Sequence, residues 1–186
     1  VAIITGAASG MGKATAQLFS QEGARVVVAD RDQKAGELVA AAIRENGNEA
    51  IFVRVDVSNS ADLKAMVEGA VSAYGRIDIL FNNAGVAGPQ FAETTEEEWR
   101  RTIDINLTGP VLGCMQVIPQ MRKQGGGNII FTGSTGGLRA GGRSPAYTAS
   151  KGGVIMASRA LAKALAKDKI RVNCVCPGTT DTGLTD

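Results

Sequence analysis

The chain has 186 residues with no histidine, and its 20 Lys and Arg against 18 Asp and Glu give a net charge of +2. This length is typical of one domain, while dispersed charge and only 4% aromatic residues exclude the basic, aromatic-rich pattern of a nucleic-acid or membrane-surface protein. Without histidine, neither a Ser-His-Asp triad nor a His-based zinc site can form, and no apolar run approaches the roughly 18 residues of a membrane span.

Short strand-like runs alternate with helical patterns along the whole chain. Six strands are predicted, at 1–5, 25–30, 50–55, 77–82, 128–132 and 170–176. Helices are predicted near 12–22, 32–46, 60–74, 96–123 and 146–167, with Thr95 and Glu98 as a capping box for the fourth. The strands are nearly continuous in apolar residues, as parallel strands covered on both faces are. The alternation predicts α/β architecture: a doubly wound parallel sheet (Rossmann-type) in a single domain.

The segment TGAASGMGKAT, residues 5–15, is a glycine turn between the first strand and the first helix. Its glycines, Gly6, Gly10 and Gly12, are spaced G-x-x-x-G-x-G, which differs from the G-x-G-x-x-G fingerprint. A P-loop is excluded because Lys13 is not followed by Ser or Thr. A turn without ligand accounts for one glycine with positive φ, whereas three glycines at a helix N-terminus favour a phosphate site.

Polar or small residues follow the carboxyl end of each predicted strand, where ligands bind in a doubly wound sheet. Asp30 ends the second strand about 20 residues past the middle of the glycine turn, where a carboxylate can hold the ribose hydroxyls of an adenosine. The later strand ends carry Asp56 and Val57, Asn82 to Gly85, Gly133 and Ser134, and Pro177 and Gly178. Each is an ordinary loop signal alone, but together they indicate a ligand site.

In the segment YTASK, Tyr147 and Lys151 lie four residues apart on one face of a predicted helix. A half-buried surface pair explains this spacing as well as a catalytic pair does. In the catalytic interpretation, an ammonium about 5 Å from the phenol favours phenolate by roughly 3 kcal/mol at an effective dielectric near 20. Tyr147 can then exchange a proton with an alcohol or ketone near neutral pH.

The three cysteines, Cys114, Cys174 and Cys176, are odd in number and lie in apolar surroundings. This pattern predicts reduced, buried thiols in a cytoplasmic protein. Cys174 and Cys176 are expected to share one face of a strand. A metal pair there is the less favoured alternative, because partner ligands are missing nearby.

Five motifs follow one another through essentially the whole chain. They are T-G-x-x-x-G-x-G at Thr5 to Gly12, N-N-A-G at Asn82 to Gly85, a helix asparagine at Asn106, Y-x-x-x-K at Tyr147 and Lys151 with Ser134 thirteen residues before the tyrosine, and P-G-x-x-x-T at Pro177, Gly178 and Thr182. In type, order and spacing, the sequence resembles the short-chain dehydrogenase/reductase family.

The resemblance implies a role for each matched residue. Tyr147 would be the general acid/base and Ser134 would orient and polarise the substrate oxygen. Lys151 would hold the nicotinamide ribose and favour the phenolate, and Asn106 would position a water toward Lys151. Cofactor contacts are implied for Gly6, Ser9, Gly10, Met11, Gly12, Asp30, Asp56, Val57, Asn83, Ala84, Gly85, Tyr147, Lys151, Pro177, Gly178 and Thr182. No metal is expected.

The implied function is hydride transfer between NAD(H) and a small-molecule secondary alcohol or ketone. Asp30 would repel the 2′-phosphate of NADP, although the neighbouring Arg31 softens that preference. One alternative is an NADPH-dependent 3-oxoacyl-carrier-protein reductase, which shares all five motifs. Another is a dinucleotide sensor without turnover, which would need only the nucleotide half of the site.

The resemblance also implies a homodimer or homotetramer without nucleic-acid or membrane partners. The two long helices would pair with their copies through small and apolar residues, namely Val111, Met115, Val154, Met156 and Ala157. Two positions depart from the family pattern, Gly133 where a serine is frequent and Thr180 where an aliphatic residue is common. Family members usually continue for several dozen residues beyond a point like Asp186, so the single domain, 1–186, is expected to lack the C-terminal strand and part of the substrate lid.

The segment NLTGP places Pro110 inside the fourth predicted helix. Proline has no N–H, so the helical bond to the carbonyl of Asn106 cannot form. A tolerated kink is one explanation. The other is that the free carbonyl binds an ordered water, which links Lys151 to solvent and resupplies the proton that Tyr147 exchanges.

Overall fold

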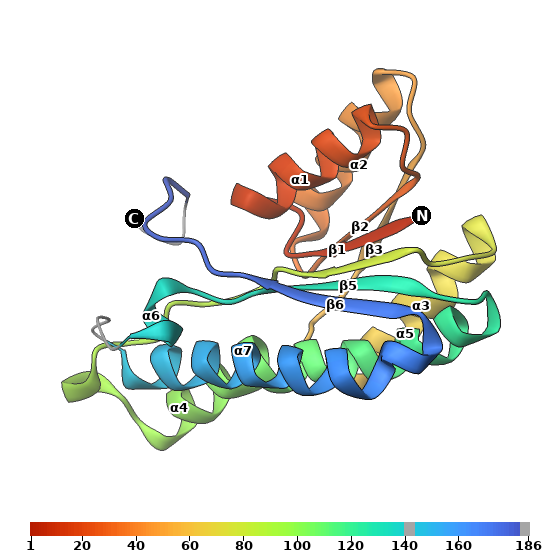
Figure 1. The fold of residues 1–186 in the computed structure, drawn as a ribbon. Coiled ribbons are helices and arrows are strands. Elements are labelled where there is room, and N and C mark those ends of the chain that lie inside the picture. The colour runs from red at the N-terminus through yellow and green to blue at the C-terminus, as the bar shows by residue number, and fades with distance from the viewer. Residues whose placement is uncertain (140–143, 183–186) are drawn as a thin grey trace.

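The computed structural model describes residues 1–139 and 144–182, and it contains a six-stranded parallel sheet with helices on both faces (Figure 1). The strands are β1 (Ala2–Thr5), β2 (Val26–Asp30), β3 (Ala50–Arg54), β4 (Ile79–Asn82), β5 (Gly127–Thr132) and β6 (Ile170–Val175). The α-helices are α1 (Gly10–Gln21), α2 (Gln33–Glu45), α3 (Ser60–Tyr74), α4 (Glu96–Ile103), α5 (Gly109–Lys123), α6 (Thr135–Leu138) and α7 (Pro145–Leu165). The strand order β3-β2-β1-β4-β5-β6 confirms the predicted doubly wound sheet.

The core has two layers because side chains alternate between the faces of the sheet. Helices α1 and α2 lie on one face, and α3, α5 and α7 lie on the other (Figure 1). Ile4 and Val28 pack in the first layer with Val39 of α2. Ile3 and Phe131 belong to the second layer, which also contains residues of α3, α5 and α7. Both layers bury continuous apolar surface, which is the main stabilising term of such a fold.

Strand β6 differs from the expectation that every strand is covered on both faces. It lies at one edge of the sheet formed by the described residues, and its Arg171 and Asn173 are exposed. Helix α7 covers only the opposite face. Cys174 lies on the covered face and packs against the core, but Cys174 and Cys176, predicted to be buried, are only partly buried, because they lie where the strand ends; Cys114 is fully buried.

The long helix predicted over 96–123 is divided into two helices. A π-helical turn, Asp104–Thr108, joins α4 to α5, and Pro110 lies in the first turn of α5. The capping box of Thr95 and Glu98 is confirmed at the start of α4. The wide turn separates two helical registers, so the irregularity lies before the proline instead of at a simple kink.

The outer faces of the long helices also differ in part from the prediction. Val154, expected to contact a second copy of the chain, is 1% exposed and belongs to the core. Met115 of α5 and Met156 of α7 are 58% and 59% exposed. In the part of the chain that the structure describes, none of the helices has the length and apolarity needed to span a bilayer.

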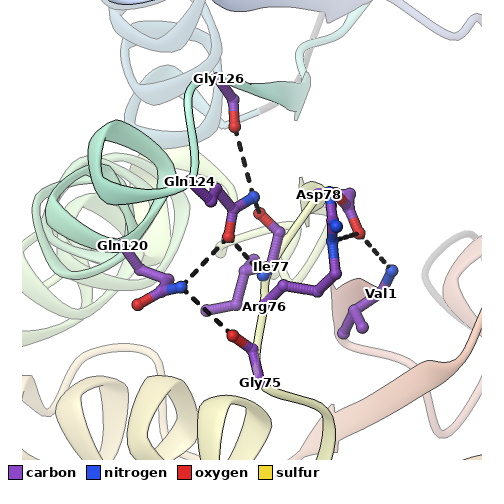
Figure 2. A network of polar contacts seen from close by, with 8 residues as sticks. All are labelled: Val1, Gly75, Arg76, Ile77, Asp78, Gln120, Gln124 and Gly126. Carbon is purple, nitrogen blue, oxygen red and sulfur yellow. Dashed lines mark hydrogen bonds and ion pairs between the residues drawn. The ribbon is translucent and has the colours of Figure 1, made fainter.

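At the amino ends of the strands, the side chain of Gln124 bonds to the backbone before β4 in the way that a neighbouring strand would (Figure 2). Its Nε2 donates to the Ile77 carbonyl at 2.6 Å, and its Oε1 accepts from the Ile77 N–H at 3.1 Å. Gln120 donates to the same Oε1 at 3.2 Å. The end of α5 is thereby tied to the residues that lead into β4.

Candidate active site

The carboxyl ends of the strands surround a cavity of about 440 Å³. Most residues predicted to bind a cofactor or substrate line it: Gly6, Ser9, Gly10, Met11, Asp30, Asp56, Val57, Asn83, Ala84, Gly85, Ser134, Tyr147, Lys151, Pro177, Gly178 and Thr182. Gly12 and Asn106 do not line the cavity and lie behind its wall. Val55, Val86, Ile105 and Thr132 line it without having been predicted.

The glycine turn and the segment after β4 meet because β1 and β4 are neighbours in the sheet. Gly6 has a φ of 66°, and a Cβ atom there would lie 2.8 Å from the Ala84 Cα atom. The Asn83 N–H donates to Thr5 Oγ1 at 3.0 Å, and Asn83 Nδ2 donates to the Thr5 carbonyl at 3.1 Å. A Cβ atom on Gly12 would overlap the Gly6 carbonyl oxygen, so this glycine allows α1 to pack against the turn.

The nucleotide side of the cavity fits a dinucleotide in its donors and acceptors. Helix α1 begins at Gly10, so its N-terminal N–H groups lie beside the cavity wall, where a pyrophosphate can bind. The Asp30 carboxylate is fixed by the Ala8 N–H at 2.9 Å and the Asp32 N–H at 3.0 Å. Thr182 closes over the turn, since its Cβ lies 3.2 Å from where a Cβ of Gly10 would be.

Asp56 is held as an anion on the same side of the cavity. Its Oδ1 accepts from the Ser58 hydroxyl at 2.6 Å and from the Ser58 N–H at 2.9 Å. These two hydrogen bonds, with a smaller contribution from the charges of Arg31 and Arg54, hold the pKa of Asp56 below its usual value. The carboxylate therefore stays charged and can accept hydrogen bonds from a ligand at neutral pH.

Ser134, Tyr147 and Lys151 come together from two elements. Ser134 ends the loop after β5 and caps α6, with its Oγ accepting from the Gly136 N–H at 3.0 Å. Tyr147 and Lys151 lie in the first two turns of α7. A Cβ atom on Gly136 would contact both Ser134 Oγ and the Tyr147 ring, at 3.4 and 3.8 Å, so both groups border the same space.

Lys151 is 4% exposed, and its Nζ donates to the Thr132 carbonyl at 2.8 Å. Burial lowers the pKa of Lys151 from 10.5 to about 8, because the charged form loses its hydration. An ammonium carries three donors, so this bond leaves two for a ligand. The Nζ atom lies 5.7 Å from the centroid of the Tyr147 ring.

Asn106, in the π-helical turn, is 1% exposed and fully hydrogen bonded. Its Nδ2 donates to the Val86 carbonyl at 2.9 Å and to Ser150 Oγ at 3.1 Å, and its Oδ1 accepts from the Val86 N–H at 2.8 Å. The side chain thus contacts the loop after β4 and the helix of Tyr147. It does not face the cavity itself.

Sequence reasoning missed Thr132 and Ser150. Thr132 contributes a backbone carbonyl, which no residue type reveals. Ser150 lies inside the YTASK segment and is completely buried; a serine on the buried face of a helix was a signal that a partner exists.

Comparison with known proteins gives consistent matches over the whole chain. The family model described as short chain dehydrogenase matches residues 1–186. The cis-4-hydroxycyclohexanecarboxylate dehydrogenase of Sinomonas cyclohexanicum is 40% identical over 99% of this chain and 74% of its own length. The 3beta-hydroxysteroid dehydrogenase 2 of Eggerthella lenta is 38% identical over 98% of this chain and 72% of its own. The crystal structure of levodione reductase superposes with a TM-score of 0.94 at 36% identity, covering 98% of this chain and 72% of that one.

Proposed function

Because the chain belongs to the short-chain dehydrogenase family of oxidoreductases, we propose that it transfers a hydride between NAD(H) and a secondary alcohol or ketone. The observation that supports this proposal is that Ser134, Tyr147 and Lys151 border one cavity with the glycine turn and Asp30. A protein that only bound a dinucleotide would not need Ser134 and Tyr147 to border this cavity as well.

In the direction of alcohol oxidation, the Tyr147 phenolate accepts the hydroxyl proton of the substrate. Ser134 Oγ, which already accepts a bond from the Gly136 N–H, donates a hydrogen bond from its hydroxyl to the substrate oxygen and keeps its proton. The nearby Lys151 ammonium stabilises the phenolate electrostatically and offers its remaining donors to the cofactor ribose. When bound, the nicotinamide ring supplies the hydride acceptor.

We expect the substrate hydroxyl to be carried on a ring. Two of the relatives are named for a hydroxycyclohexanecarboxylate and a hydroxysteroid. The test is an absorbance assay at about 340 nm with NAD⁺ or NADP⁺ and a panel of cyclic and open-chain secondary alcohols. Turnover of none of them with either cofactor would contradict the proposal.

The chain offers a matched pair of tyrosine variants for this assay. Tyr147→Phe should lower kcat by about 10² to 10⁴, because it removes the acid/base and little surface. NADH binding, followed by fluorescence, should change little. Tyr74→Phe is the control, since the only other tyrosine of the chain packs against Arg25. Activity of Tyr147→Phe above about a tenth of wild type would exclude the acid/base role.

We also propose that the protein is a homodimer or homotetramer formed through α5 and α7. The exposed Met115 and Met156 supply apolar surface on these helices, and such surface usually marks an interface when it is continuous. Light scattering of the full chain at micromolar concentration tests this. A monomer would contradict it.

A further inference from the structure

Ser150 lies between the two proposed catalytic residues of α7 and points away from the cavity. The side chain is completely buried. Its hydroxyl donates to the Tyr147 carbonyl at 2.7 Å and accepts from Asn106 Nδ2 at 3.1 Å. One hydroxyl therefore joins the first turn of α7 to the π-helical turn 44 residues earlier.

Asn106 extends this connection to the loop that follows β4. Its amide pairs with both backbone groups of Val86, accepting from the N–H at 2.8 Å and donating to the carbonyl at 2.9 Å. Because the Val86 N–H must face an acceptor, the amide orientation is determined by this pairing. The second proton of Nδ2 is then directed to Ser150 Oγ, so all the polar atoms of the amide are engaged.

The oriented amide and the buried ammonium both border one glycine of the cavity wall. Asn106 Oδ1 and Lys151 Nζ lie 3.2 and 3.5 Å from the position that a Cβ atom of Gly85 would occupy. Asn106 therefore lies directly behind the wall of the cavity, which it does not itself line.

We propose that Ser150 is a positioning residue, which orients the Asn106 amide and thereby fixes the helix of Tyr147 and Lys151 relative to the loop after β4. Ser150 touches neither the cavity nor a ligand, so it acts through Asn106. This inference rests on the proposed function for its kinetic consequences, but the coupling of Ser150 to Asn106 can be measured without turnover.

Ser158 provides a matched control on the same helix. It is 4% exposed, and its hydroxyl donates to the carbonyl three residues earlier, Ile155, at 2.8 Å, as Ser150 does to Tyr147. It lies about 12 Å farther along the helix axis. Ser150→Ala and Ser158→Ala therefore remove the same kind of helix bond, whereas only Ser150→Ala removes a bond to Asn106.

The first experiment compares kcat, KM and NADH affinity of these two variants of the full chain. Ser150→Ala should lower kcat for alcohol oxidation about tenfold or more, with KM and NADH affinity changed by less than about threefold. Ser158→Ala should keep kcat within about twofold. Equal losses of kcat in both variants, or a loss in Ser150→Ala that appears in KM instead of kcat, would overturn the proposal.

The second experiment is a double-mutant cycle on stability, with Ser150→Ala, Asn106→Ala and the combined variant unfolded in urea. Coupling should appear as a deviation from additivity of about threefold or more in the unfolding equilibrium constant, whereas Ser158→Ala with Asn106→Ala should be additive. Additive effects for Ser150 and Asn106 would refute the connection. The two proposals can fail separately. If the cycle shows this coupling and the wild-type protein binds NADH but oxidises no alcohol, only the proposed function is contradicted.

Discussion

The buried ammonium of Lys151 lies 5.7 Å from the centre of the Tyr147 ring and is anchored to the carbonyl of Thr132. The sequence alone suggested a separation of about 5 Å from the spacing of the two residues on one helix face. What the spacing could not reveal is the anchor on β5, which holds the charge against the strand. The charge is therefore kept near the phenol by the sheet as well as by the helix.

Replacing Lys151 by methionine should stabilise the protein while abolishing turnover. Burial lowers the pKa of Lys151 from 10.5 to about 8, which corresponds to a folding penalty of about 3 kcal/mol at neutral pH. Loss of the bond to Thr132 offsets about 1 kcal/mol of this gain. We expect Lys151→Met to raise the free energy of unfolding by about 1 to 2 kcal/mol at neutral pH, measured in urea.

The pH dependence of that gain has a definite sign. Below pH 8 the lysine is charged in both states, so the wild-type protein carries the whole penalty. Between pH 8 and 10.5 the folded lysine is neutral while the unfolded one is still protonated, so wild-type stability rises with pH. The advantage of Lys151→Met should therefore shrink across this window. An advantage that stays constant with pH would show that desolvation of the charge is not its cause.

The Asp30 carboxylate should make the enzyme prefer NAD over NADP by at least about tenfold in kcat/KM, because the 2′-phosphate would meet a like charge. Asp30→Asn is the informative variant, since its amide oxygen can still accept from the Ala8 N–H and keep the turn in place. This variant should weaken the binding of NAD and reduce the preference for NAD over NADP in kcat/KM. Equal kcat/KM values for the two cofactors in the wild type would contradict this interpretation and favour the carrier-protein reductase alternative.

Gly133 is required by the two cysteines behind it. A Cβ atom at this position would lie 2.8 Å from Cys174 Sγ and 2.9 Å from Cys176 Sγ. Gly133→Ser should therefore cost about 1 to 3 kcal/mol of stability and lower activity by displacing the adjacent Ser134. Adding Cys174→Ala to Gly133→Ser should restore part of the lost stability and part of the lost activity.

A control for that substitution is Gly69→Ala in α3, where a Cβ would make an ordinary 3.6 Å contact with Val53. It should leave stability equal or slightly higher, since alanine favours the helix by about 1 kcal/mol. Thermal unfolding and initial rates measure both series. If Cys174→Ala failed to relieve Gly133→Ser, steric overlap with the thiols would not be the cause.

Pro110→Ala should slow turnover more than it weakens NADH binding. The new N–H can form the helical bond to the Asn106 carbonyl that proline forbids, and this bond would displace the ordered water that we expect at the carbonyl. Pro119→Ala, in the exposed middle of the same helix, is the control. An unchanged kcat in Pro110→Ala, or a crystal structure with the wild-type Asn106 carbonyl bonded to a protein group instead of water, would contradict this role.

All six strands could be predicted from the sequence because their apolar runs are short, β-branched and bounded by turn residues. Features that depend on contacts with residues far away in the sequence could not be predicted. The exposure of Arg171 depends on which strand lies at the edge, and the role of Ser150 depends on Asn106 in another helix. The π-helical turn at Asp104–Thr108 has no pattern of its own, although Pro110 indicated an irregularity nearby. The strand ends, in contrast, converge for topological reasons alone, so most cavity residues could be named in advance.

The pairing of Gln124 with both backbone groups of Ile77 also supports the register that β4 takes between β1 and β5. A slip of this strand by one residue would turn each side chain to the opposite face of the sheet. Leu80 would leave its core layer, and Asn83 would lose its place beside Thr5 at the other end. Six residues of extended chain, about 20 Å, separate Ile77 from Asn83. The Gln124 amide thus helps to set how far along the sheet Asn83 lies. A shorter side chain at position 124 should therefore change the contact of Asn83 with Thr5, although Gln124 touches neither residue.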